Sequence, residues 1–181
     1  MIMKILVAYF SATGTTGVVA TELAKAIEAD VYEIVPEVPY SNEDLNWRDE
    51  NSRSSVEMKD DSSRPAIGSA KIEDMDQYEI VFLGFPVWWY IAPHIINTFL
   101  ESYNFSGKKI VLFATSGGSG IGETAEKLRP SAPGAQIFKG EILNGTKTEK
   151  YLKIFAENYI MYDRTQTAMK QLEEDGYNLK N

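Results

Sequence analysis

The sequence predicts an α/β fold in which helices cover both faces of a parallel β-sheet. Short apolar runs of strand length recur along the chain, at residues 4–10, 31–35, 79–85, 109–115 and 136–143. Helical apolar patterns fill the gaps after three of these runs, at residues 15–28, 93–103 and 122–129. Strands that are apolar on both sides and alternate with helices are typical of a sheet buried between two helical layers. We expect the 181 residues to form one domain.

The first apolar run leads directly into a turn that is rich in hydroxyl groups. A glycine, Gly14, lies in this turn among four hydroxyl residues: Ser11, Thr13, Thr15 and Thr16. A helix that starts here leaves unpaired backbone N–H groups and the positive end of its dipole beside the hydroxyls. Such a turn can bind a phosphate, or its hydroxyls can simply cap the helix.

The turn carries no cation, which limits the kind of phosphate that it can bind. No lysine or arginine lies between Lys4 and Lys25. A Walker-type triphosphate loop needs a lysine, and a dinucleotide fingerprint needs three spaced glycines, whereas only Gly14 and Gly17 are available here. A neutral cradle of hydroxyl and amide groups fits a terminal monophosphate.

Three segments together resemble the flavodoxin family, whose members bind FMN. The turn sequence Ser11-Ala12-Thr13-Gly14-Thr15-Thr16 is similar to the family's phosphate loop, [ST]-x-T-G-x-T, and residues 80–93 and 110–122 resemble its two flavin loops. The resemblance covers residues 4–145 and implies a doubly wound, five-stranded parallel sheet in the order 2-1-3-4-5. The FMN-binding residues that it implies are Ser11, Ala12, Thr13, Gly14, Thr15, Thr16, Pro86, Val87, Trp88, Trp89, Tyr90, Thr115, Ser116, Gly117, Gly118 and Gly122.

The two flavin loops contain residue types that suit a flat ring. The second of the three segments, residues 80–93, has three consecutive aromatic residues: Trp88, Trp89 and Tyr90. They would form a wall against an isoalloxazine ring; the alternatives are that they fill a gap in the core or form a dimer contact. The third segment, residues 110–122, ends in a loop whose small residues would let backbone amides approach the pyrimidine edge of the flavin: Gly117, Gly118 and Gly120. It does not complete the G-x-S-x-G motif of serine hydrolases, because Ile121 replaces the last glycine.

Two regions depart from the simple alternation of strands and helices. Residues 37–71 are polar, with a weak helical pattern near residues 44–56, and we expect an irregular surface excursion there that holds an irregular second helix. Residues 146–181 form a C-terminal helical region with extra length, in which the capping box Asp163-Arg-Thr-Gln166 predicts a final helix over residues 163–175. Residues 146–162 would then be an added helix, an interface or part of the final helix itself.

Composition excludes several classes of site. The chain has no cysteine and one histidine, so disulfides, thiolate metal sites and histidine clusters are impossible. We expect that histidine, His94, to be exposed on a helix; the alternative is a proton donor to a quinone at the flavin edge. A net charge of −8 argues against binding to nucleic acid. No apolar run has membrane-spanning length and no signal-peptide pattern is present, so we expect a cytoplasmic protein without membrane insertion.

The sequence leaves two functions open. The resemblance implies an electron carrier, which we favour; the alternative is an FMN-dependent NAD(P)H or quinone oxidoreductase. Flavodoxins stabilise the one-electron semiquinone by flipping a peptide of the second loop, but this chain has no glycine there between Gly84 and Gly107. An enzyme that uses NAD(P)H would need an arginine near the pocket to bind the phosphate of the nicotinamide nucleotide, and the nearest candidate in the sequence is Arg129. The partner would be a redox protein or a small donor or acceptor such as a quinone or NAD(P)H.

Overall fold

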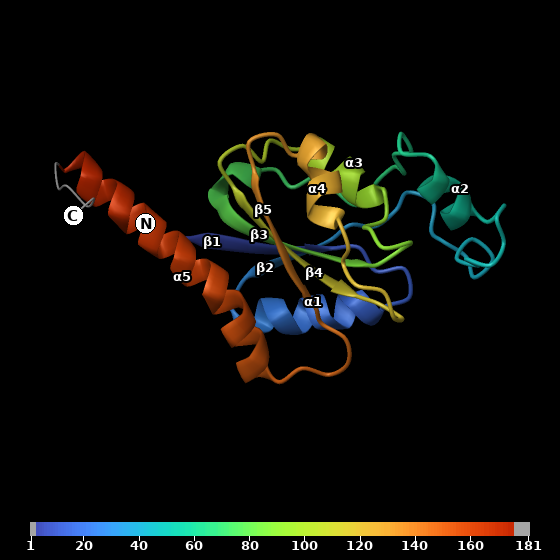
Figure 1. The fold of residues 1–181 in the computed structure, drawn as a ribbon, viewed down its shortest axis with the longest axis horizontal. Coiled ribbons are helices and arrows are strands. Elements are labelled where there is room, and N and C mark those ends of the chain that lie inside the picture. The colour runs from blue at the N-terminus through green and yellow to red at the C-terminus, as the bar shows by residue number, and fades with distance from the viewer. Residues whose placement is uncertain (1–2, 176–181) are drawn as a thin grey trace.

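Five parallel strands form one sheet that lies between two layers of helices (Figure 1). The computed structural model describes residues 3–175 of the chain. The strands stand in the order β2-β1-β3-β4-β5, which confirms the predicted order. All the predicted strands are present, with ends close to those expected: β1 Lys4–Tyr9, β2 Asp30–Glu33, β3 Tyr78–Pro86, β4 Lys109–Thr115 and β5 Gln136–Ile142.

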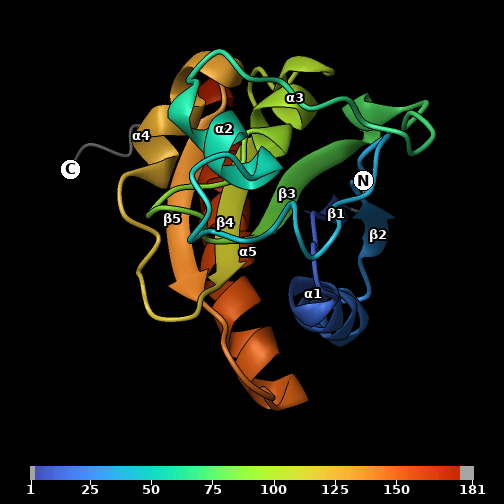
Figure 2. The same cartoon turned by 90° about the vertical axis from the view of Figure 1, so that its right-hand side faces the viewer.

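Helices cover both faces of the sheet, as the sequence predicts. Helices α1 (Thr15–Ala26) and α5 (Glu149–Glu174) pack on one face, and α3 (Ile95–Glu101) and α4 (Thr124–Leu128) pack on the other. Figure 2 shows α1 and the start of α5 below the sheet, with α3 and α4 above it. Short 3-10 turns precede β3 and follow α4: Met75–Gln77 and Arg129–Ser131.

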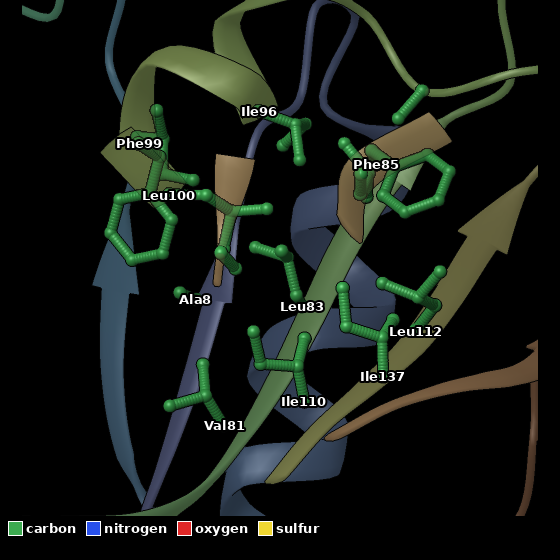
Figure 3. Packing of buried hydrophobic residues seen from close by; sticks show 14 of the residues in the cluster. Ala8, Val81, Leu83, Phe85, Ile96, Phe99, Leu100, Ile110, Leu112 and Ile137 are labelled. Carbon is green, nitrogen blue, oxygen red and sulfur yellow. The ribbon is translucent and has the colours of Figure 1, made fainter. Parts of the chain in front are cut away.

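Alternate residues of the central strands belong to two hydrophobic cores, one on each face of the sheet. From β1, Leu6 and Ala8 join the core beneath α3 and α4, whereas Val7 joins the core beneath α1 and α5. Figure 3 shows the first of these cores, with Leu83 of β3 and Phe99 of α3 among its side chains. A shift of one residue would exchange the two faces, so this alternation fixes the strand register and the positions of the loops that follow.

The C-terminal helix is longer than the sequence predicts. Helix α5 is continuous and begins after Thr148, whose hydroxyl accepts a hydrogen bond from the backbone N–H of Tyr151 at 3.1 Å. The predicted start at Asp163 is wrong, because Asp163 lies inside α5, is 3% exposed and forms an ion pair with Lys109 of β4. Residues 149–162 are therefore the first part of the final helix, and its later part extends beyond the sheet (Figure 1).

The excursion between β2 and β3 contains one short helix, which lies later in the chain than expected. The expected second helix is present as α2 (Arg53–Lys59), but it begins only after Ser52, whose hydroxyl caps it, and so overlaps only the end of the weak helical pattern at residues 44–56. Upstream, Ser41 and Asp44 exchange side chain–backbone hydrogen bonds of 2.9 and 3.1 Å. Such bonds compete with helical ones and hold this segment in turns.

Candidate functional site

Three loops meet at the carboxyl edge of the sheet, after β1, β3 and β4, where the sequence predicts them. They line a cavity of about 670 Å³, which we call the loop cavity. This volume lies in the usual range for the binding pocket of a cofactor or small ligand. The predicted site residues that line it are Ala12, Thr13, Pro86, Val87, Trp88, Trp89, Tyr90, Gly117 and Gly118.

The first loop forms a cradle at the start of α1. Gly14 precedes the helix with a φ of +89°, a left-handed conformation that glycine adopts without strain. The hydroxyl of Ser11 accepts a hydrogen bond from the backbone N–H of Gly17 at 3.0 Å, which fixes the turn. Thr13 and Thr15 are exposed, and their hydroxyls lie 3.4 Å apart. Both hydroxyls can therefore donate to an anion placed at the helix start.

Thr16 has a structural contact that the sequence does not reveal. Its side chain is 1% exposed, and its hydroxyl lies 2.8 Å from the hydroxyl of Thr115 at the end of β4. This buried pair joins the first loop to the third. The exposed hydroxyls of Thr13 and Thr15 are therefore better placed for a ligand than that of Thr16.

The second loop is a tight hairpin turn that contains two strained residues. Trp88 and Ile91 exchange backbone hydrogen bonds of 2.9 and 3.2 Å, and between them Trp89 and Tyr90 have φ values of +47° and +67°. Positive φ at both central positions is typical of a type I′ turn, which usually contains asparagine or glycine. A left-handed conformation costs about 1–2 kcal/mol for each residue with a side chain. Both strained residues line the loop cavity. Strained residues are often found at functional sites.

Removing this strain should stabilise the ligand-free protein. We expect Tyr90→Gly to have a free energy of unfolding about 1 kcal/mol higher than that of Tyr90→Ala, because glycine adopts positive φ freely. Urea denaturation of both variants measures the difference. The same pair at Val18, an exposed residue of α1, should show the opposite order, since alanine favours a helix. Equal stabilities at Tyr90 would mean that the turn relaxes in solution.

The three aromatic residues of the second loop lie in different environments. Trp88 packs edge-on against Phe10 and Tyr40, with ring centroids 5.7 and 5.4 Å apart. Trp89 and Tyr90 are 44% and 67% exposed. Trp88 therefore anchors the loop to the core, whereas Trp89 and Tyr90 are available to stack on a flat ligand.

Another wall of the loop cavity comes from the excursion between β2 and β3, which was not among the predicted parts of the site. Leu45, Trp47 and Ser54 line the cavity, and Trp47 is 67% exposed. The guanidinium of Arg48 lies 5.2 Å from the ring centre of Trp47. The signal that could have identified this wall is Trp47 itself, a large aromatic residue in a polar segment.

Tyr40 holds the excursion against the second loop. Its ring packs on Trp88, and its hydroxyl donates a hydrogen bond to the carboxylate of Glu57 at 2.5 Å. Burial and this hydrogen bond both raise the pKa of the Tyr40 hydroxyl, so Tyr40 remains the donor. The guanidinium of Arg53 lies 4.0 Å from the Tyr40 ring centre and binds Glu57 at 2.8 Å.

The third loop is held in place by Asn144, a residue that lies outside the three loops. Gly117, Gly118 and an unpredicted residue, Ser119, line the loop cavity. Asn144, which follows β5, accepts a hydrogen bond from the N–H of Ser116 at 2.8 Å and donates one to its carbonyl at 2.7 Å. Asn144 was not among the predicted site residues, although its position just after a strand at the same sheet edge could have identified it.

Gly122 connects the third loop to the second. Its φ is +60°, and a Cβ at this position would overlap the carbonyl oxygen of Tyr90. Gly122 therefore supports the strained turn from behind and does not line the loop cavity. The predicted residues Thr115 and Ser116 likewise hold the loops in position, through Thr16 and Asn144.

The single histidine is not exposed, so that prediction is wrong. His94 is 6% exposed and belongs to a buried stretch with Ala92 and Ile95. It lines a separate pocket beside α3 and α4, not the loop cavity, and so it is not placed at a ligand there. Arg129 pairs with Glu126 at 3.8 Å and is also absent from the lining of the loop cavity.

Two kinds of feature are absent from the described residues. Within residues 3–175, acidic and histidine side chains form no cluster of three that could hold a metal ion. No helix in this part of the chain is long and apolar enough to cross a membrane. The loop cavity instead offers hydroxyl and N–H groups beside exposed aromatic rings, which suits an organic ligand with an anionic end and a flat end.

The family model of the flavodoxins matches residues 4–159. The chain belongs to the flavodoxin family. The match includes all five strands and all three loops of the site, so the resemblance seen in the sequence motifs is confirmed. Among curated protein sequences no match was found.

Solved structures agree with this membership of the flavodoxin family. A flavoprotein from Bacteroides eggerthii is 49% identical, with a TM-score of 0.79, over 85% of this chain and 96% of that one. A flavoprotein from Bacteroides uniformis is 46% identical, with the same TM-score of 0.79, over 86% and 98% of the two chains. A Lactobacillus acidophilus flavoprotein, solved in complex with FMN, is 21% identical, with a TM-score of 0.58 over 76% and 91%, and shares the fold.

Proposed function

We propose that this member of the flavodoxin family binds FMN in the loop cavity and transfers electrons through it. The observation that carries the proposal is the meeting of two features at the loop cavity, which Thr13 of the cradle lines together with Trp89 and Tyr90. A neutral cradle of hydroxyl and N–H groups lies at the start of α1, and the exposed rings of Trp89 and Tyr90 lie in the next loop. FMN carries a phosphate and a flat ring system and needs both features. When bound, it supplies one- and two-electron redox chemistry.

The residues of the three loops have separate roles toward FMN. The hydroxyls of Thr13 and Thr15 and the N–H groups at the start of α1 would bind the phosphate. The backbone amides of Gly117 and Gly118 would approach the edge of the ring, where larger residues would stand in the way. Trp89 would exclude water from the ring, and a less polar surrounding disfavours a charged reduced flavin.

An acidic surface beside the loop cavity favours a protein partner with a basic surface. Within residues 41–61, five carboxylates are exposed and only two cations: Glu43, Asp49, Glu50, Asp60 and Asp61 against Arg48 and Lys59. The same segment contributes Trp47 to the cavity wall. Opposite charges accelerate the encounter of two proteins and orient them. This surface supports the role of electron carrier.

A specific observation favours a second candidate, an FMN-dependent NAD(P)H or quinone oxidoreductase. Arg48 stacks on Trp47 at the cavity wall and is a cation that could contact the phosphate of NAD(P)H. In addition, Trp89 and Tyr90 already have positive φ. A flip of the peptide between them would leave Trp89 in a backbone conformation that is essentially restricted to glycine. That cost weighs against the peptide flip by which flavodoxins stabilise a half-reduced flavin.

Photoreduction of the purified protein distinguishes the two candidates. Because the strained turn resists a flip, we expect the blue one-electron-reduced flavin to accumulate less than in a dedicated one-electron carrier. Absorbance spectra during stepwise photoreduction measure it. Nearly complete conversion to the blue form would contradict this expectation and favour the carrier outright. Little blue form, together with rapid quinone reduction driven by NAD(P)H, would favour the enzyme.

We also expect the purified protein to carry noncovalent FMN with quenched emission. Stacking by Trp89 would quench the flavin, so Trp89→Ala should restore emission and weaken FMN binding by about 1–3 kcal/mol. Fluorescence titration of the apoprotein measures both effects. Trp88→Ala is the comparison, because Trp88 packs on Phe10 and its loss should lower the stability of the fold. Release of FAD on denaturation, or no affinity for flavin, would reject FMN as the cofactor.

A further inference from the structure

A second cavity adjoins the loop cavity on the side of α2. It has a volume of about 540 Å³ and shares two lining residues with the loop cavity, Trp47 and Trp89. The rest of its lining comes from α2 and from the residues that follow Trp47: Arg48, Glu50, Ser55, Met58 and Lys59. We call it the α2 pocket. A molecule bound there would lie against the same two tryptophans as a molecule in the loop cavity.

The apolar part of the lining suits a flat ring. Trp47 and Trp89 are both exposed, although large aromatic side chains contribute most free energy when they are covered. Met58 of α2 is half-buried, and a thioether forms favourable contacts with aromatic rings. Two indoles and a thioether around one cavity therefore favour a planar aromatic ligand.

Arg48 is the polar group that a ligand in the α2 pocket can use. Its guanidinium lies 5.2 Å from the ring centre of Trp47 and, among the described residues, forms no ion pair and no hydrogen bond. Lys59, by contrast, pairs with the carboxylate of Glu50 at 3.5 Å. Guanidinium N–H groups donate hydrogen bonds and cannot accept them, so a ligand that uses Arg48 needs an oxygen acceptor.

The charges in and around the α2 pocket favour an uncharged ligand. Because Lys59 and Glu50 pair with each other, Arg48 leaves the lining with one positive charge, which disfavours a cation. The acidic surface around the pocket disfavours an anion, since residues 41–61 carry five exposed carboxylates against two cations. A neutral ring with a carbonyl oxygen meets neither repulsion and still accepts a hydrogen bond from Arg48.

We propose that the α2 pocket is a second ligand site, which binds an uncharged planar aromatic carbonyl compound of the quinone type. The ring lies against Trp47 and Trp89, and a carbonyl oxygen accepts a hydrogen bond from Arg48. Of the two small molecules named for the second candidate function, the pocket thus favours a quinone over NAD(P)H, which carries phosphates. The inference rests on the proposed function only for the role of this molecule beside a flavin. Binding to the α2 pocket needs no flavin.

Indole NMR resonances test the proposal on the protein as purified, in air and without a reductant. Titration with 1,4-naphthoquinone should shift the indole resonances of Trp47 and Trp89 in a saturable way. The third tryptophan of the chain is the internal reference, because Trp88 packs on Phe10 and does not line the α2 pocket. Addition of the quinone to thiols does not interfere, since the chain has no cysteine. A shift that does not saturate, or that is equal at Trp88, would overturn the proposal.

Two variants and two further probes test the role of Arg48. Arg48→Ala should raise the Kd for 1,4-naphthoquinone at least fivefold and leave that for naphthalene unchanged, because naphthalene has the same rings without oxygen atoms. Arg129→Ala removes another exposed arginine, outside the α2 pocket, and should change neither Kd. NAD⁺ should bind at least tenfold more weakly than the quinone. An unchanged Kd for the quinone in Arg48→Ala, an equal loss for naphthalene, or tighter binding of NAD⁺ would each contradict the proposal.

Equilibrium dialysis of the apoprotein with FMN separates this inference from the proposed function. Saturating 1,4-naphthoquinone should leave the Kd for FMN unchanged within twofold, because the two ligands occupy different cavities. Competition between them would mean that the α2 pocket is part of the FMN site, and the inference would be wrong. If the protein binds no flavin but binds the quinone with the expected dependence on Arg48, the inference holds and only the function proposed above is wrong.

Discussion

Gly140→Ala is expected to destabilise the protein by about 3 kcal/mol and to weaken FMN binding as well. Gly140 lies in β5 with a φ of +63°, and a Cβ there would overlap the carbonyl oxygen of Leu112 in the neighbouring strand. The position is a β-bulge: Val111 pairs with Phe138 and Phe113 pairs with Glu141, so β5 has one residue more than β4 between these pairs. Alanine would be strained by its φ and would also push the two strands apart.

The bulge also determines where β5 ends relative to the third loop. After it, the N–H of Leu143 donates to the carbonyl of Ala114 at 2.7 Å, and Asn144 then lies opposite Ser116. If the bulge is lost, Asn144 no longer forms both of its hydrogen bonds to Ser116. The third loop should then become less ordered, and FMN affinity should fall together with stability.

Urea denaturation of the apoprotein and fluorescence titration with FMN measure the two effects. Gly107→Ala is the matched control, because Gly107 also has a positive φ, +78°, but a Cβ there would meet nothing within 4 Å. Its free energy of unfolding should fall only by the cost of the left-handed conformation, about 1–2 kcal/mol, and its FMN affinity should not change. Equal losses of stability in the two variants would show that the contact with Leu112 is unimportant.

The sequence was sufficient to predict the sheet and the three loops because the signals for them are local. Each strand is a short apolar run, and each loop begins where such a run ends in hydroxyl, aromatic or glycine residues. Parallel strands place their carboxyl ends at one edge, so the loops had to meet there. The order of the strands followed from the family resemblance, and the structure confirms it.

The errors concern residues whose roles depend on distant partners. Asp163 matches a helix start in its local pattern, but its carboxylate pairs with Lys109 of β4 and it lies inside α5. His94 follows a proline at a helix start, where exposure is common, but packing around α3 buries it. Trp47 reaches the loop cavity from a polar segment whose helical pattern is weak. Local patterns carry no information on contacts of this kind.

Combining Thr13→Ala with Thr15→Ala is expected to raise the Kd for FMN more than a hundredfold while the fold remains intact. Each hydroxyl would donate to a charged phosphate, and such a hydrogen bond contributes about 1.5–3 kcal/mol. Both side chains are exposed, so their removal leaves no cavity in the core. Thr16→Ala should behave differently and lower the stability, because its hydroxyl is buried against that of Thr115 at 2.8 Å.

Riboflavin provides the sharpest control for this prediction, because it has the same ring and side chain as FMN but no phosphate. The double variant should therefore bind riboflavin as tightly as the unmodified protein does, and only the advantage of FMN over riboflavin should disappear. Thr21→Ala removes an exposed hydroxyl further along α1, where it donates to the carbonyl of Gly17, and should leave both affinities unchanged. Fluorescence titration of the apoproteins, with circular dichroism to verify folding, measures these constants. If the double variant keeps the affinity for FMN, the phosphate lies elsewhere; if it loses riboflavin to the same extent, the two hydroxyls position the loop and do not bind the phosphate.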